Sequence, residues 1–188
     1  FNNIFLTGVL IIGTFVYTYK LFHKQTINLQ IWQLVIDPQQ YRVAVFTTAL
    51  ILGYIVPLID IYYFRFLYPT DALGTLFLYL YHMLFTSALI YYGLQKGSIY
   101  RHLASLLVIL NTLFYIISAH RLPTTELFEL FSAPENKFHW VFFLHFLSLG
   151  ALIFQVKLLL DQAKQGGLHP IFSHKFMPWP LAFALIFT

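Results

Sequence analysis

The sequence predicts an all-α fold: a multi-pass transmembrane helical bundle with five full spans and the start of a sixth. Two observations lead to this fold class. Of the 188 residues, 59% are hydrophobic and only 10% are charged, whereas roughly a quarter of the residues of a soluble domain are charged. The apolar residues also form runs of ~20, the length that a helix needs to cross ~30 Å of hydrocarbon.

The same composition excludes several other classes of protein. A chain this apolar is neither a water-soluble globule nor a disordered tail. It has no cysteine, which excludes disulfide-stapled modules, thiolate zinc sites and iron–sulfur clusters. The net charge of +4 comes without a basic cluster or fold signature typical of nucleic-acid binding. We therefore expect lipid to be the main solvent of this chain, and no nucleic-acid partner.

Each span is placed on its own apolar run. In hydrocarbon every backbone N–H must bond within its own segment, so long runs form helices even where they are rich in Phe, Ile and Val. A transmembrane barrel would instead show ~10-residue segments of alternating polarity, and the sequence has none. The expected spans are residues 4–22, 43–66, 72–94, 99–119, 138–160 and, truncated, 177–188.

Residues 1–188 show no sign of a domain boundary and are expected to form a single transmembrane segment. The chain begins at Phe1 inside one apolar run and stops at Thr188 inside another. This pattern predicts a segment of a longer protein.

Two connections have the pattern of short interfacial amphipathic helices. In residues 27–41, apolar side chains recur at helical spacing before Pro38, which predicts a helix lying in the membrane surface. Residues 123–131 place Leu127, Leu130 and Phe131 on one stripe and two glutamates towards water.

The basic residues divide unequally between the two faces of the membrane. Connections alternate sides, which puts eight basic residues on one face and three on the other. By the positive-inside rule the first face is cytoplasmic, and Phe1 then lies outside. The eight are Lys20, Lys24, Arg42, Lys96, Arg101, Lys157, Lys164 and Lys175; the three are Arg65, Arg121 and Lys137.

Polar side chains within the spans are the candidates for function, because each costs free energy in hydrocarbon unless it finds a partner. His82 is the deepest ionisable residue, close to the expected midplane, and Asn111 reaches a similar level. His145 lies somewhat nearer the outer surface. Asp60 follows Pro57 near the outer end of the second span.

These four residues, Asp60, His82, Asn111 and His145, admit two interpretations. One is a proton or ion path of a transporter or channel. The other is interhelical hydrogen bonding, with Asp60 as a carboxylate at the membrane interface. We favour the second interpretation, because nothing in the sequence fixes these residues on one helix face.

No metal site or enzyme motif is predicted. The chain lacks HExxH, P-loop, GxSxG and GxGxxG patterns, so no catalytic residue is assigned. A haem between His82 and His145 stays open as an alternative, although their expected depths differ by ~6 Å.

Small residues within the spans predict close helix packing. Lipid offers no hydrophobic drive for association, so backbones approach where side chains are small. The candidates are Gly8, Gly13, Ala49, Gly53 and Gly150.

Two stretches resemble a family of long multi-pass bacterial membrane proteins. They are Phe5-Leu6-Thr7-Gly8, which opens a span, and residues 122–149, where a short amphipathic stretch leads into an aromatic-rich helix. The resemblance covers about a third of the chain. It implies further spans and a bacterial inner membrane, but no activity and no site residues.

The sequence thus predicts an integral membrane region with a structural or assembly role in a larger membrane complex. Its expected partners are the lipid bilayer and other transmembrane helices, of the same chain or of a complex. A transporter or channel is the first alternative, and a haem-binding redox subunit is the second.

Overall fold

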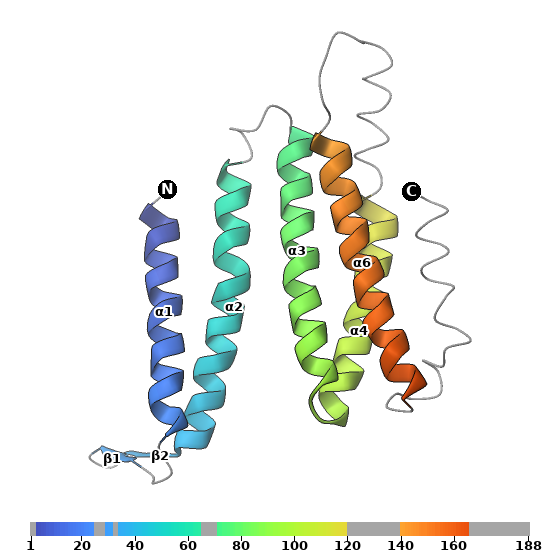
Figure 1. The fold of residues 1–188 in the computed structure, drawn as a ribbon. Helices are drawn as coiled ribbons and strands as arrows, with labels where there is room; N and C mark the ends of the chain where they lie inside the picture. The colour runs from blue at the N-terminus through green and yellow to red at the C-terminus, as the bar shows by residue number, and fades with distance from the viewer. Residues whose placement is uncertain (1–2, 25–28, 32–33, 65–70, 120–139, 166–188) are drawn as a thin grey trace, which may run out of the picture. The chain divides into compact units, whose positions relative to one another are not determined.

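A computed structural model describes residues 3–24, 29–31, 34–64, 71–119 and 140–165. It confirms the predicted fold class: five helices are long and apolar enough to cross a membrane (Figure 1). They are α1 (Asn3–His23), α2 (Pro38–Phe64), α3 (Asp71–Leu94), α4 (Ser98–Phe114, continued by the π-helical turn η2, Tyr115–Ala119) and α6 (Trp140–Lys164). The truncated span at 177–188 and the interfacial helix at 123–131 lie outside the described residues.

The chain divides into two compact units, residues 1–63 and residues 64–188. The first holds α1, α2 and the connection between them; the second holds α3, α4, η2 and α6. The expectation of one continuous bundle stays a prediction. Each unit is described separately below.

In the first unit, α1 and α2 pack through a small residue and a set of rings. A side-chain carbon added at Gly8 would collide with Cγ1 of Val56, so the two backbones approach closely at that point. Nearer the other end of α1, the Tyr19 and Phe46 rings lie 5.5 Å apart and the Phe22 and Tyr41 rings 4.5 Å apart. Aromatic contacts of this kind add to the packing between the helices.

The connection between α1 and α2 corrects one prediction. The expected interfacial helix within residues 27–41 is wrong: β1 (Leu29–Ile31) pairs antiparallel with β2 (Leu34–Ile36), and α2 begins at Pro38. Leu29 and Ile31, like Leu34 and Ile36, also alternate with a period of two, the period of a strand. Over so short a stretch, β-branched residues and the pairing partner decide in favour of strands.

The second unit is a three-helix core in which α3 packs against both α4 and α6, and α4 packs against α6. Buried residues of α3 recur at alternating steps of three and four, the spacing of a coiled-coil seam. They are Leu73, Leu76, Leu80, Met83, Ser87, Ile90 and Leu94. The buried faces of α4 and α6 follow the same spacing through Ala104, Val108, Asn111 and Tyr115 and through His145, Ser148, Leu152, Gln155 and Leu159. We call these three stripes the seam.

The glycines differ in what surrounds them. A Cβ added at Gly13, Gly53 or Gly150 would meet no described atom within 4 Å, although each was a candidate for close packing. Gly93, which the sequence analysis did not single out, is buried where α3 meets α4: an added Cβ would lie 3.2 Å from the Tyr100 carbonyl oxygen. Ala49, the remaining packing candidate, is half-buried on α2.

Candidate functional site

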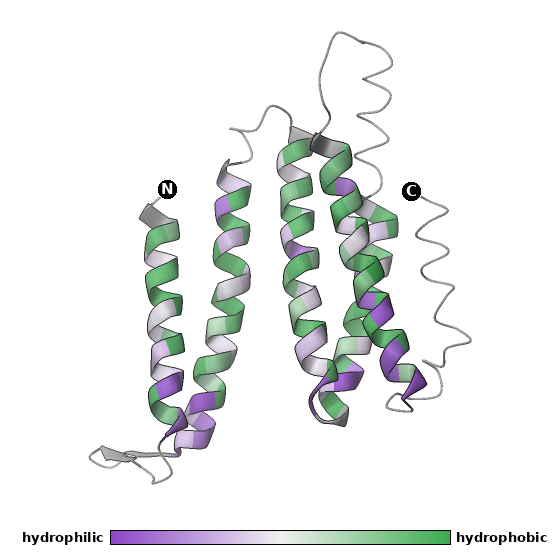
Figure 2. Cartoon of the chain, viewed as in Figure 1, coloured by the Kyte–Doolittle hydropathy of each residue, from purple (hydrophilic) through white to green (hydrophobic). Residues whose placement is uncertain are grey.

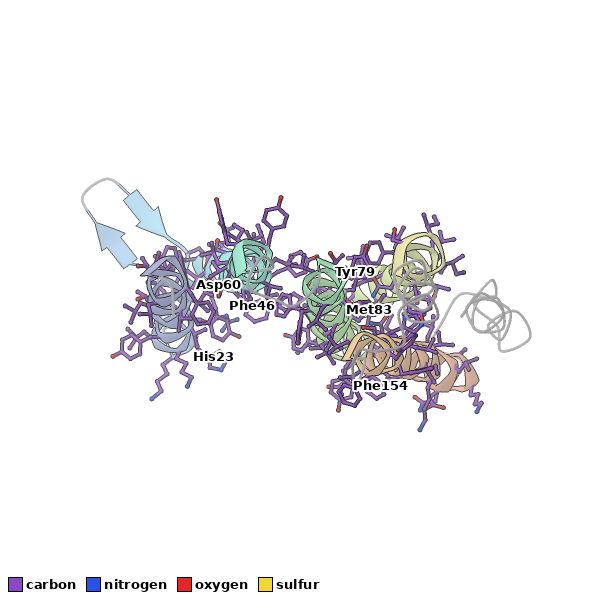
Figure 3. All side chains as sticks on the ribbon, turned by 90° about the horizontal axis from the view of Figure 1, so that it is seen from above. His23, Phe46, Asp60, Tyr79, Met83 and Phe154 are labelled. Carbon is purple, nitrogen blue, oxygen red and sulfur yellow. The ribbon has the colours of Figure 1, made fainter. Side chains whose placement is uncertain are left out.

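Five polar side chains of the second unit meet at the seam, and we call them the polar cluster. Asn111, Gln155, Thr86 and Ser87 are almost fully buried, and His82 is half-buried. Figure 2 shows the surrounding helices as predominantly apolar, with polar residues interspersed. Figure 3 shows Met83, one of the seam residues next to the cluster, on the side of α3 that faces α4 and α6.

Asn111 of α4 joins all three helices through its side-chain amide. Its Oδ1 lies 3.1 Å from Nε2 of His82 on α3. Its Nδ2 donates to Oγ1 of Thr86 at 2.8 Å and to Oε1 of Gln155 on α6 at 2.9 Å. Both hydrogens and the oxygen of this amide are therefore engaged.

Gln155 of α6 completes the network and anchors it to the backbone. Its Nε2 donates to the Met83 carbonyl oxygen at 3.0 Å and to Oγ of Ser87 at 2.9 Å. Thr86 and Ser87 in turn donate to carbonyl oxygens of the preceding turn of α3. Within the cluster, the amide of Gln155 is satisfied at both ends, even though the side chain has 0% exposure.

The Met83 carbonyl determines which atom is the donor in each hydrogen bond between Gln155, Asn111 and His82. A carbonyl oxygen only accepts, so the Gln155 atom that faces Met83 is the amide nitrogen. The Oε1 of Gln155 then accepts from Asn111, and the Oδ1 of Asn111 is left to accept from His82. The ring proton of His82 that faces Asn111 is therefore on Nε2.

A second polar pair lies at another level of the same core. Oη of Tyr115 lies 3.0 Å from Nε2 of His145, and both side chains are buried, with exposures of 0% and 3%. Their rings also stack, with centroids 5.6 Å apart. Tyr115 is the first residue of η2, a π-helical turn of the kind that often marks a functional position.

A cluster of mainly apolar side chains lies between the pair and the polar cluster. His145 and Gln155 are ten positions apart in the sequence, which places them about 15 Å apart along α6. Leu149 and Leu152 fall between them and pack with Met83 and Tyr115 into one buried cluster. The buried hydroxyls of Thr112 and Ser148 also lie between the two levels, and each donates to a carbonyl oxygen of its own helix.

The structure distributes the four candidates of the sequence analysis over three places. His82 and Asn111 are bonded to each other. His145 binds Tyr115 instead. Asp60 belongs to the first unit, where its Oδ1 is buried and has no hydrogen-bond partner among the described residues (Figure 3).

Sequence reasoning missed Thr86, Ser87 and Tyr115 as members of these sites and did not include Gln155 among the candidates. The signal was present in the seam spacing. Ser87 occupies a seam position between Met83 and Ile90, and Gln155 occupies one between Leu152 and Leu159. A polar residue in such a position faces the neighbouring helices.

The histidines of the described residues do not converge on a metal. Within that part of the chain, no group of three or more His, Asp or Glu side chains is arranged to hold an ion. A bis-histidine haem needs two imidazole nitrogens directed at one iron. Instead, Nε2 of His82 and Nε2 of His145 each lie at hydrogen-bond distance from a different side chain.

Fold and sites together define a multi-pass helical membrane protein whose spans pack against one another and contact lipid. No protein-family model, no curated protein and no solved structure matches the chain. The resemblance to long bacterial membrane proteins therefore stays a prediction.

The Tyr115–His145 bond gives a first testable expectation. Tyr115→Phe removes the hydroxyl but keeps the stacked ring, so we expect the free energy of unfolding in bicelles to fall by ~0.6 kcal/mol, the average for an interhelical hydrogen bond in a membrane. Tyr79→Phe is the matched control, since the Tyr79 ring packs on Phe114 at 5.1 Å. Equal effects of the two substitutions would contradict a stabilising Tyr115–His145 bond.

Proposed function

We propose that this chain is a structural region of a larger membrane assembly, and that the polar cluster fixes the register of α3, α4 and α6. The observation that carries the proposal is the saturation of the two buried amides. Every N–H hydrogen and both oxygens of Asn111 and Gln155 are used within the cluster. No amide donor is left over to bind a substrate.

The position of the cluster supports a role in register. A polar residue in a coiled-coil seam favours one alignment of the helices, because any other alignment would leave its donors in an apolar surrounding. Asn111 and Gln155 both occupy seam positions and bond across it. Sliding α6 by one turn against α4 would break this bond.

The outward faces of the helices support an assembly role. In α1 and α2, only 6% of the residues in an apolar 18-residue stretch of each span are buried within the described structure. Large apolar side chains such as Leu10, at 72% exposure, face outward. Such faces suit lipid and further transmembrane helices.

The transport alternative receives less support from the same geometry. Amide side chains do not take up or release protons near neutral pH, so Asn111 does not relay a proton from His82, to which it is hydrogen-bonded. The apolar side chains of Met83, Leu149 and Leu152 also pack between the two polar sites. A transport path would require water to replace this packing.

Cysteine labelling distinguishes the structural and transport hypotheses, and the chain has no native cysteine to interfere. Ser87→Cys changes one atom within the polar cluster, and Gln95→Cys lies in the exposed turn between α3 and α4. With a membrane-impermeant thiol reagent, we expect Gln95→Cys to react and Ser87→Cys to stay unmodified. Reaction of both at similar rates would place water in the cluster and favour transport.

The orientation is part of the same proposal: the Lys96 turn faces the cytoplasm and the Glu129 loop faces the outside. We expect Gln95→Cys to be labelled from the cytoplasmic side and Glu129→Cys from the opposite side. Labelling of both variants in the same sealed vesicles from one side would overturn this topology.

A further inference from the structure

The first unit gathers basic side chains at one end of its two helices, outside the polar cluster of the second unit. Lys20, His23 and Lys24 stand on α1 and at its end with spacings of three and four residues, so they share one helix face. Arg42 stands in the second turn of α2. We call these four residues the basic end.

A hydrogen bond between α1 and α2 organises the basic end. Nη1 of Arg42 lies 3.1 Å from Nδ1 of His23. A guanidinium only donates, so Nδ1 of His23 is the acceptor and the ring proton is on Nε2. Besides the three cationic groups, the basic end thus holds a second kind of donor, the Nε2–H of an exposed imidazole.

The positive charge of the basic end is not balanced within the described part of the chain. There, no carboxylate oxygen lies within 4.0 Å of Lys20, Lys24 or Arg42, and the ion pair between Asp161 and Lys164 belongs to the second unit. The nearest acid in sequence to Arg42 is Asp37, whose Oδ1 accepts from the backbone N–H of Gln39 at 2.9 Å. Asp37 therefore caps the start of α2.

Contacts between aromatic rings pack α1 against α2 next to the basic end. The Phe22 and Tyr41 rings contact each other across the two helices, and Tyr19 contacts both Phe46 and the His23 ring. Figure 3 labels His23 beside α1 in the first unit. The donors are therefore carried on packed helix ends, at the point where two candidate spans reach the membrane surface.

From this arrangement we infer that the basic end is a binding site for the phosphate group of an anionic membrane lipid. Phosphate oxygens accept hydrogen bonds from lysine, arginine and imidazole N–H groups, and arginine binds them in a bidentate manner. Basic residues at the end of a span attract anionic headgroups. The lipid is favoured over free phosphate because two spans deliver the donors to headgroup level, next to exposed apolar positions such as Leu21 at 51% exposure.

Native mass spectrometry of the full chain, released from nanodiscs, tests the site. The probes are phosphatidylglycerol and phosphatidylcholine, and the variant is Lys20→Gln/Lys24→Gln/Arg42→Gln. We expect the native chain to retain phosphatidylglycerol over phosphatidylcholine. Each lost charge weakens lipid attraction about fivefold, so we expect the triple variant to lose about a hundredfold in preference.

A matched control separates this site from a general effect of charge. Lys96→Gln/Lys157→Gln/Lys164→Gln removes the same number of charges from the second unit, and we expect it to keep the preference. Equal losses in the two triple variants would overturn the inference, as would an unchanged preference in the first. Displacement of the lipid by millimolar inorganic phosphate would assign the site to a free anion instead.

A conservative variant tests whether misfolding, and not the loss of charge, accounts for a lost lipid preference. Arg42→Lys keeps the charge but loses the planar fork, and we expect it to keep most of the preference for phosphatidylglycerol and an unchanged melting temperature. Loss of lipid preference together with a lowered melting temperature in all variants, Arg42→Lys included, would make the basic end a purely structural contact.

Discussion

Asn111→Leu will lower the free energy of unfolding of the second unit by about 2 kcal/mol. The substitution removes three hydrogen bonds to neighbouring helices, each worth ~0.6 kcal/mol on average in a membrane. It also leaves Oε1 of Gln155 without its donor inside a buried core, which adds to the loss. Reversible unfolding in bicelles measures the change.

A double-mutant cycle makes this prediction specific to the network. Gln155→Leu alone should cost a similar amount, because it strands the Asn111 amide. The double variant should cost clearly less than the sum, since two apolar side chains then meet without an unsatisfied group between them. Additive costs would contradict the network.

A control on the same helix separates the network from span stability in general. Leu110 is the residue before Asn111 and is 52% exposed. Leu110 faces away from the seam, so we expect Leu110→Ala to change the free energy of unfolding only slightly. If Leu110→Ala lowers the free energy of unfolding as much as Asn111→Leu, the effect comes from the stability of α4 itself and not from its hydrogen bonds to α3 and α6.

The spans were predictable from the sequence because membrane insertion depends on one coarse property, the length of an apolar run. All five full spans coincide with observed helices. Their ends differ where local chemistry decides: α2 begins at Pro38 instead of residue 43, because Asp37 caps it and proline suits the first turn of a helix.

The depth of the polar residues in the membrane was predictable from the sequence, but the helix face on which each side chain lies was not. Counting residues from the membrane surface placed His82 and Asn111 at one level, and they bond to each other. Depth alone does not tell which way a side chain faces. His145 stands on the seam of α6, where its partner is Tyr115, a residue type that composition arguments assign to the membrane surface.

The β1–β2 hairpin could not be predicted from the spacing of apolar residues alone. Ile27, Ile31, Leu34 and Val35 fit the period of a helix, while Leu29, Ile31, Leu34 and Ile36 fit that of a strand. A stretch this short carries too few repeats to separate the two periods. In the observed register, Leu29 pairs with Ile36 and Ile31 pairs with Leu34. This register depends on contacts between two strands, which the pattern of one strand alone does not contain.

The second large effect is expected at Gly8, where α1 meets α2. In Gly8→Ala the new methyl group would overlap Cγ1 of Val56 and lie 3.1 Å from Cγ2. Valine is stiff about χ1, so the conflict is relieved only by moving the helices apart. We expect the first unit to lose about 1–3 kcal/mol of stability, the usual cost of overpacking, measured by thermal unfolding in bicelles.

Two further variants make the Gly8 prediction sharp. Gly13→Ala is the same change on the same helix, and there the methyl group meets no described atom within 4 Å. It should leave stability unchanged or raise it by up to ~1 kcal/mol through helix propensity. Val56→Ala should rescue Gly8→Ala, because it removes the atoms that collide. If Gly8→Ala behaves like Gly13→Ala, or if Val56→Ala fails to rescue it, the close approach of α1 and α2 at Gly8 is not what holds the first unit together.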